Sequence, residues 1–158
     1  MRLFLLGAPC AGKTTLMGPL RRELDCPVLD MDEELKVMNK GAWPPLERKR
    51  DLSRQVILQA SELEDVVLAY SLLGDNELAL LRAREWWLAL LDLPESVMRS
   101  RAAIRERREG WSNVWWLPSH LDNIAYLRQR DAFTSVLDAT RPVREVVEDV
   151  LALMRRCP

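Results

Sequence analysis

The chain is poor in several features that would tie it to particular classes of protein. It has only three cysteines, at positions 10, 26 and 157, and no C-x-x-C pair. An odd number of cysteines without such spacing favours reduced thiols, so we expect a cytoplasmic protein. An excess of charge is also missing, because 23 basic and 24 acidic side chains leave a net charge of -1. The chain therefore lacks the basic field that draws proteins to nucleic acid.

Long hydrophobic runs are absent as well. The longest run after the N-terminus, WWLALL at residues 86–91, falls far short of the ~20 residues that a membrane span requires. The N-terminal run RLFLL is too short for a secretory signal. A chain of 158 residues, 48% of them apolar, can bury roughly two thirds of its unfolded surface in one core. We expect a single domain over residues 1–158.

Short apolar runs alternate with segments of helical period, which is the pattern of parallel strands joined by crossover helices. Nearly continuous apolar strands indicate a sheet with helices on both faces. Residues 110–118, GWSNVWWLP, have no clear period and are predicted to form a loop. The expected strands are residues 2–6, 27–30, 65–70, 86–91 and 132–138. The expected helices are residues 13–24, 33–40, 45–62, 76–84, 94–109, 119–130 and 142–156.

The first expected strand runs into GAPCAGKTT at residues 7–15, which satisfies the pattern G-x-x-x-x-G-K-[ST]. A strand before the pattern and a helix after it are the context that this phosphate-binding loop requires. Glycines let the backbone N–H groups face the phosphates, and the helix N-terminus adds partial positive charge. Lys13 is expected to reach the β- and γ-phosphates, and the Thr14 hydroxyl to ligate Mg²⁺. The predicted nucleotide-binding residues here are Gly7, Ala8, Pro9, Cys10, Ala11, Gly12, Lys13, Thr14 and Thr15.

A second polar group, VLDMDEE, ends the strand expected at residues 27–30. Asp30 and Asp32 would lie at the carboxyl edge of the sheet, where ligands bind in open α/β folds. On an extended segment the two carboxylates point to opposite sides. One of them can then face Mg²⁺, while the other faces an acceptor hydroxyl and takes its proton. The alternative is that the acidic run caps and begins a helix, and Asp32 could do this and still act.

Signatures of other nucleotide-binding classes are missing. The chain has no N-K-x-D stretch, and no D-x-x-G follows the strand at residues 65–70, which argues against a GTPase switch. That strand leads to Ser71 rather than to an acidic residue, which argues against a motor ATPase. The pattern favours a small kinase in which the acidic residue that faces the metal ion comes from a segment other than the end of this strand.

Over nearly its whole length the chain resembles the small P-loop phosphotransferases related to shikimate kinase, gluconate kinase and adenylate kinase. The resemblance rests on GAPCAGKTT, on the D-x-D of Asp30 and Asp32, on LDLPESVMRSR at residues 91–101 and on DATRP at residues 138–142. It implies a P-loop NTPase fold, with a parallel five-stranded sheet in the order 2-3-1-4-5 and a lid at about residues 102–120. It also implies ATP and Mg²⁺ as cofactors, with Asp30 on the magnesium side and Asp32 at the acceptor.

Arginines after the strand at residues 86–91 extend this resemblance. It implies that Arg101 packs on the adenine, that Arg108 holds the transferring phosphate, and that Arg141 and Pro142 embrace the other side of the base. Independently of the resemblance, Arg101, Arg105 and Arg108 are spaced i, i+4, i+7 and share one helical face. Three guanidinium groups on one face suit a triphosphate. The alternative is a solvated face paired with the glutamates of the same segment.

The residues that would select the acceptor depart from the family pattern. Shikimate kinases carry a glycine triplet after the third strand, where this chain has YSLLG at residues 70–74, which argues against shikimate itself. The lid tryptophans either stack on the acceptor or pin the lid to the next helix. The relatives place an acceptor-gripping arginine before the third strand, although LERKRDLSR also fits a solvated face. The candidate acceptor residues are Asp32, Arg50, Arg54, Tyr70, Ser71 and Trp111.

The sequence thus predicts an ATP-dependent phosphotransferase that moves the γ-phosphate to a hydroxyl or phosphate group of a small molecule. Lys13, Asp32 and Arg108 are the predicted catalytic residues, and Thr14 and Asp30 the predicted magnesium ligands. One alternative is a polynucleotide 5′-hydroxyl kinase, whose loop G-x-P-x-x-G-K-[ST] the chain also satisfies, although a net charge of -1 argues against a groove for nucleic acid. The other is a nucleotide-binding regulatory module with slow hydrolysis and no small acceptor.

Overall fold

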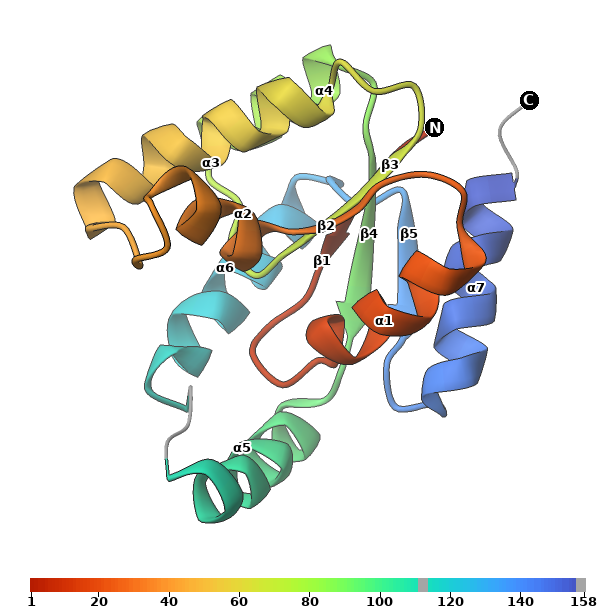
Figure 1. Cartoon of the computed structure of the whole chain (residues 1–158). Helices are drawn as coiled ribbons and strands as arrows, with labels where there is room; N and C mark the ends of the chain where they lie inside the picture. Colours follow the sequence, from red (N-terminus) through yellow and green to blue (C-terminus); the bar gives the residue numbers. More distant parts are fainter. Residues whose placement is uncertain (111–113, 156–158) are drawn as a thin grey trace.

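The computed structural model describes residues 1–110 and 114–155, which form an α/β fold around one parallel sheet (Figure 1). Within these residues the sheet has five strands in the order β2-β3-β1-β4-β5, and every neighbouring pair is parallel. The strands are β1 (Arg2–Leu6), β2 (Val28–Asp30), β3 (Val66–Tyr70), β4 (Trp87–Asp92) and β5 (Ser135–Asp138). The predicted fold class and strand order are both confirmed.

Helices connect the strands in the predicted alternation. In the described part of the chain they are α1 (Lys13–Glu23), α2 (Met31–Met38), α3 (Leu46–Ala60), α4 (Asp75–Ala83), α5 (Glu95–Glu109), the 3₁₀ helix η1 (Val114–Trp116), α6 (Leu117–Gln129) and α7 (Val143–Arg155). Across residues 1–110 and 114–155, none of these helices has both the length and the apolar character that crossing a membrane would need.

The core lies on both faces of the central strands. Residues 3–6 of β1 and all five residues of β3 are buried, as expected for strands that helices cover on two sides. On one side α1 and α7 lie against each other (Figure 1). The rings of Phe4 and Trp86 meet edge to face at 6.3 Å, and the Trp86 indole N–H donates to the Ser61 hydroxyl at 2.8 Å. This bond satisfies a polar group that burial would otherwise penalise.

The parallel sheet gathers the predicted motifs at one edge. Because all five strands run in the same direction, the phosphate loop after β1, Asp30 at the end of β2 and Tyr70 at the end of β3 share the carboxyl edge. Helix α5 stands beyond this edge, apart from the other helices (Figure 1). The ligand-binding edge of an open α/β sheet thus carries the candidate chemistry.

The predicted loop at residues 110–118 is wrong in its second half. Val114–Trp116 form η1, and α6 begins at Leu117, two residues before its predicted start. Pro118 falls in the first turn of α6, where its missing N–H costs no helical hydrogen bond. Residues 111–113 lie outside the described part of the chain, so the lid expected at about residues 102–120 stays a prediction.

Candidate active site

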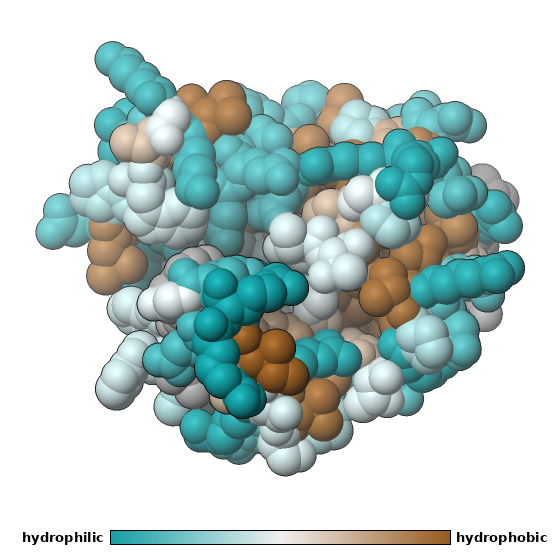
Figure 2. Space-filling model, turned by 60° about the horizontal axis from the view of Figure 1, so that its bottom comes forward, coloured by the Kyte–Doolittle hydropathy of each residue, from teal (hydrophilic) through white to brown (hydrophobic). Residues whose placement is uncertain are grey.

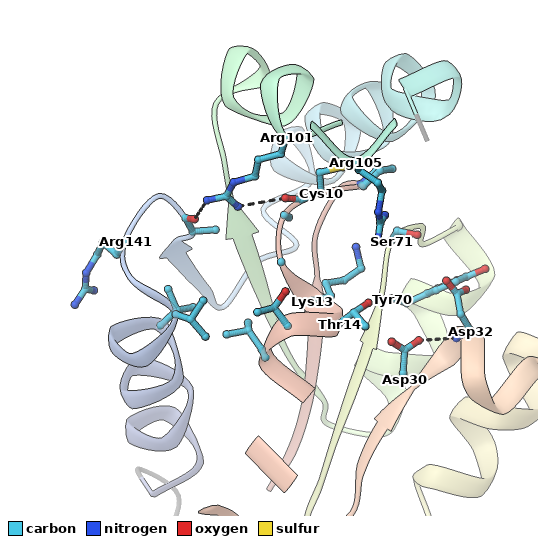
Figure 3. Close-up of a pocket in the computed structure, with 18 residues that line it drawn as sticks. Cys10, Lys13, Thr14, Asp30, Asp32, Tyr70, Ser71, Arg101, Arg105 and Arg141 are labelled. Atoms are coloured by element: carbon cyan, nitrogen blue, oxygen red, sulfur yellow. Dashed lines mark hydrogen bonds between the residues drawn. The ribbon is translucent and has the colours of Figure 1, made fainter. Parts of the chain in front are cut away.

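A cavity of about 440 Å³ opens at the carboxyl edge of the sheet (Figure 3). Its walls bring together the predicted residues Pro9 to Thr15, Asp30, Asp32, Tyr70, Ser71, Arg101 and Arg141. Three other residues predicted to bind the nucleotide do not line it: Gly7 and Ala8 of the loop are buried, and Pro142 is exposed. The cavity therefore unites segments from four strands' ends and from α5, as the sequence motifs predict.

Backbone geometry explains the glycines of the phosphate loop. Gly12 has a φ of +96°, in the left-handed region that side chains disfavour. Gly7 is needed for a different reason, since a Cβ there would lie 3.1 Å from the Ala11 Cβ and 3.2 Å from the Leu91 Cβ. Cys10 also has a left-handed backbone, with a φ of +66°, although it is not glycine. The loop thus carries conformational strain at Cys10.

Lys13 begins α1 and turns back over the loop. Its ammonium group donates to the carbonyl oxygens of Gly7 and Ala8, the latter at 3.0 Å. Burial lowers the pKa of Lys13 to about 8, although the carboxylates of Asp32 and Asp30 oppose the shift. A phosphate group placed in the loop would restore the missing solvation of this ammonium group, so Lys13 is prepared to bind an anion.

Asp30 and Asp32 meet at the start of α2. The Asp30 carboxylate caps the helix by accepting a hydrogen bond from the Asp32 backbone N–H at 2.9 Å (Figure 3). The expectation that both lie on an extended segment is wrong, because this cap ends β2 at Asp30 and begins α2 at Met31. Both carboxylates nevertheless line the cavity. Capping and facing the ligand cavity are therefore compatible.

The electrostatics of Asp32 suit proton transfer. It stands at the wall of the cavity, open to solvent on one side and surrounded by protein on the other. Burial raises the pKa of Asp32, and the negative charge of Asp30 raises it further, while Lys49 and Lys13 oppose the shift. A carboxylate with a raised pKa is a stronger base than an ordinary aspartate.

The donor set beside the loop fits Mg²⁺. Thr14 and Asp30 line the same cavity and offer a hydroxyl and a carboxylate oxygen. Magnesium is commonly bound by one or two protein oxygens together with water and substrate phosphates. Within residues 1–110 and 114–155, no cluster of three or more His, Cys, Asp or Glu side chains forms a closed metal cage. The oxygens present therefore fit a metal that arrives with a nucleotide.

Arginines of α5 close the upper wall of the cavity. Arg101 joins two loops, because its guanidinium donates to the Cys10 carbonyl at 3.2 Å and to the Ala139 carbonyl at 3.3 Å (Figure 3). Arg105 points into the cavity on the side of Ser71, and its charge acts on Lys13 (Figure 3). Arg108, by contrast, does not line the cavity, and its side chain is 77% exposed. Of the two candidates for the phosphate contact, this structure places Arg105 in the site.

One apolar wall of the cavity was not predicted. Ala139, Val143 and Val146 line it beside Arg141, whose own guanidinium points outward and pairs with Glu145 at 2.9 Å (Figure 3). A flat base could lie against these small side chains. Valines of α7 read as ordinary core residues in the sequence, so no sequence signal separated them from the packed face of the helix.

Three of the predicted acceptor residues line a second cavity that adjoins the first, whereas Asp32 and Ser71 line only the first. Tyr70 lines both cavities, and Arg50 and Arg54 line only the second. Lys49, which the sequence analysis did not select, also lines it, with its ammonium group 4.7 Å from the centre of the Trp43 ring. The charge-rich stretch around residues 46–54 gives no sequence signal that separates Lys49 from its neighbours. Trp111 lies outside the described residues, so its predicted role stays a prediction.

The surface at this end of the molecule is largely hydrophilic. Figure 2 shows the end that carries α5, where hydrophobic residues appear as separate areas among hydrophilic ones. The exposed hydrophobic side chains near it include Ile104, Trp115 and Trp116, with exposed fractions of 55%, 85% and 66%. The polar surroundings suit a site that takes charged and hydroxylated small molecules from water.

Comparisons with known proteins place these features in context. No protein-family model matches the chain. Over 96% of its length it is 31% identical to a shikimate kinase of Aquifex aeolicus (strain VF5), and the match covers 94% of that protein. A crystal structure of shikimate kinase from Bacteroides thetaiotaomicron has a TM-score of 0.74 at 18% identity, covering 98% of both chains. A gluconokinase from Sinorhizobium meliloti 1021 has a TM-score of 0.70 at 21% identity, covering 98% of this chain and 91% of that one.

Proposed function

We propose that this protein, which belongs to the shikimate kinase family of small P-loop kinases, transfers the γ-phosphate of ATP to a hydroxyl group of a small molecule. Kinase activity on a small molecule follows from the family. The choice of a hydroxyl over a phosphate acceptor is supported by one observation above all. Asp32, a carboxylate with a raised pKa, lines the cavity of the phosphate loop, and its charge acts on Tyr70, which lines both cavities. It can therefore take a hydroxyl proton there.

In this reaction each group of the site has a distinct part. The acceptor oxygen attacks the γ-phosphorus, the bond from that phosphorus to the β,γ-bridging oxygen breaks, and ADP leaves. The hydroxyl proton passes to Asp32. Lys13 and Arg105 offer positive charge to the phosphoryl oxygens, as such sites need in the transition state. Holding donor and acceptor in adjoining cavities supplies the positioning on which phosphoryl transfer depends.

Mg²⁺ is part of the proposal, with Thr14 and Asp30 as the residues that would hold it. When bound, the ion would neutralise charge on the β- and γ-phosphates. Arg101 and the apolar wall of Ala139, Val143 and Val146 are the proposed contacts of the nucleoside. A cytoplasmic location, with Cys10 and Cys26 as free thiols, also stays a prediction.

The acceptor is proposed to differ from shikimate. The chain has YSLLG at residues 70–74, and the Leu73 backbone N–H and C=O are bonded to the Asn123 side chain at 3.1 and 2.9 Å. These two backbone groups are therefore occupied within the protein. Where the family carries a glycine triplet, this chain therefore lines the second cavity with the larger side chains of Leu72 and Leu73.

The proposal is tested by ADP release from Mg·ATP with a panel of acceptors. The panel contains sugars, polyols, nucleosides and a 5′-hydroxyl oligonucleotide, each compared with the rate without acceptor. We expect at least one small hydroxyl compound to raise the rate well above that baseline, with a phosphate ester as product. A response to the oligonucleotide alone would identify a polynucleotide kinase instead. Baseline rates throughout would favour the regulatory nucleotide-binding module.

Asp32→Asn supplies the second half of this test. We expect the variant to lose about 10²- to 10⁴-fold in kcat, since general-base catalysis is worth about that much. The Kd for ATP should change by less than about threefold, because Asp30 and Thr14 remain. A large loss of ATP affinity in this variant would instead place Asp32 on the metal side.

A further inference from the structure

The second cavity has a volume of about 450 Å³, within the roughly 300–1,000 Å³ of typical ligand pockets. It lies between α3, the segment after β3 and the beginning of α4, with Asn123 of α6 as a further wall. Tyr70 separates it from the phosphate cavity, and burial raises the pKa of Tyr70 to about 12, so its hydroxyl stays neutral. Asp32 does not line this cavity, but its charge acts on Tyr70 and Lys49, which do.

Of the two arginines that line this cavity, Arg54 is the less exposed, and its charge is already paired with a carboxylate. Arg54 Nε donates to Glu77 Oε1 at 3.0 Å, and the Glu77 side chain is only 12% exposed. Asp51 adds a second carboxylate 3.8 Å from Arg54. Gly74 makes room for the pair, because a Cβ at that position would lie 2.6 Å from Glu77 Oε2. The ion pair is therefore built into the wall.

Three other charged side chains line the wall, from Lys49, Arg50 and Asp75. The Lys49 ammonium group lies over the Trp43 and Tyr70 rings, at 4.7 and 5.4 Å from their centres. The negative charge of Asp32 also acts on Lys49 and opposes the lowering of its pKa by burial. Arg50 lies at the exposed rim. Asp75, a second acid of the wall, accepts a hydrogen bond from the Tyr126 hydroxyl at 2.6 Å.

From this arrangement we propose that the acceptor is an uncharged polyhydroxyl compound, such as a neutral sugar or cyclitol, and that Glu77 excludes acceptors that carry a carboxylate. The assignment rests on the proposed kinase function and names the acceptor class of that site. A carboxylate bound beside Arg54 would also lie beside Glu77, and like charges repel. Hydroxyl groups donate as well as accept, so they can bond to the Glu77 carboxylate.

The test uses acceptor pairs in which one member carries a carboxylate and the other a neutral group at the same position, such as gluconate with glucitol and shikimate with its methyl ester. Phosphate ester formation and ADP release give kcat/KM for each member. We expect the neutral member to be favoured by about tenfold or more, because an acceptor carboxylate beside Arg54 would meet the Glu77 carboxylate that already pairs with this guanidinium. Glu77→Gln keeps the side-chain shape and releases Arg54, so it should raise the carboxylate-to-neutral ratio of kcat/KM by about tenfold.

Two variants control this change of preference. Asp51→Asn removes the other acidic neighbour of Arg54. The Asp51 side chain is 71% exposed and does not line the cavity, so the carboxylate-to-neutral ratio of kcat/KM should stay as in the wild type. The double variant Arg54→Met with Glu77→Met removes both charges together. It should keep the neutral preference, because an acceptor carboxylate finds no guanidinium at position 54. This variant can be measured even if Glu77→Gln folds poorly. Circular dichroism and thermal unfolding verify the fold of each variant.

The outcomes separate the acceptor class from the kinase function. Phosphorylation with a preference for the carboxylate members would overturn the acceptor class and leave the kinase function standing. An unchanged ratio in Glu77→Gln would overturn the role of Glu77. If no acceptor of any class were phosphorylated, the proposed kinase function would fail, and the acceptor class with it.

Discussion

The Asp30 carboxylate accepts a hydrogen bond from the Asp32 backbone N–H at 2.9 Å. This single contact ends β2, begins α2 and holds two carboxylates on one wall of the nucleotide cavity. Their closeness helps to raise the pKa of Asp32. The cap therefore has a chemical consequence, because it makes Asp32 a better proton acceptor.

The raised pKa of Asp32 predicts the acid limb of the pH–rate profile. Transfer needs ionised Asp32, so kcat/KM should fall as pH falls through its pKa, at a pH above the ~3.9 of an ordinary aspartate. Glu34→Gln is the matched control, because burial also raises the pKa of Glu34 but Glu34 does not line the cavity. We expect the limb to persist in Glu34→Gln and to vanish from the residual rate of Asp32→Asn. The opposite pattern would assign the limb to Glu34.

The lowered pKa of Lys13 predicts that nucleotide binding is linked to proton uptake. Its pKa is about 8 in the free protein, and phosphate oxygens would raise it in the complex. Affinity for Mg·ATP should therefore weaken as pH rises above about 8, by up to about tenfold for each pH unit. Isothermal titration calorimetry in two buffers of different ionisation enthalpy measures the protons taken up.

Lys13→Arg is the control for that measurement. Arginine stays protonated throughout this range, so its affinity for Mg·ATP, although reduced, should not depend on pH between about 7 and 9. Wild-type binding without proton uptake at pH 8 to 9 would contradict the prediction.

Arg105 and Arg108 form a matched pair for locating the phosphate contact. Both bond to Glu109, at 3.2 and 2.8 Å, but only Arg105 lines the cavity. Arg105→Met should lower kcat/KM by about 10²-fold, as expected for a lost transition-state donor, and Arg108→Met by less than about threefold. The two variants should lose similar, small amounts of stability. A larger kinetic effect at Arg108 would support the family-derived assignment instead.

The left-handed backbone at Cys10 predicts a gain of stability on substitution by glycine. Cys10→Gly relieves the steric cost of a φ of +66°, whereas Cys10→Ala removes the thiol and keeps that cost. Urea unfolding should show Cys10→Gly to be the more stable of the two by about 1 kcal/mol. Equal stabilities would mean that the loop relaxes around the β-carbon.

Much of the fold could be predicted because its signals are local. Apolar runs of strand length mark β1, β3 and β4, and the pattern G-x-x-x-x-G-K-[ST] needs only eight residues, 7–14. The beginning of α6 could not be predicted in the same way. Leu117 and Pro118 follow tryptophans that have no helical period, and packing of the buried Leu117 and His120 decides where the helix begins.

The site residues also fall into those that local sequence signals identify and those that depend on tertiary packing. By itself the sequence determined that Lys13, Thr14 and the acids Asp30 and Asp32 would lie near one another, because motif spacing follows from short stretches of backbone. Only the tertiary structure decided that Arg105 rather than Arg108 faces the cavity and that Glu77 neutralises Arg54. Arg54 and Glu77 are 23 residues apart. Contacts of this kind depend on how α3, α4 and α5 pack against the sheet, and helical spacing alone does not specify that packing.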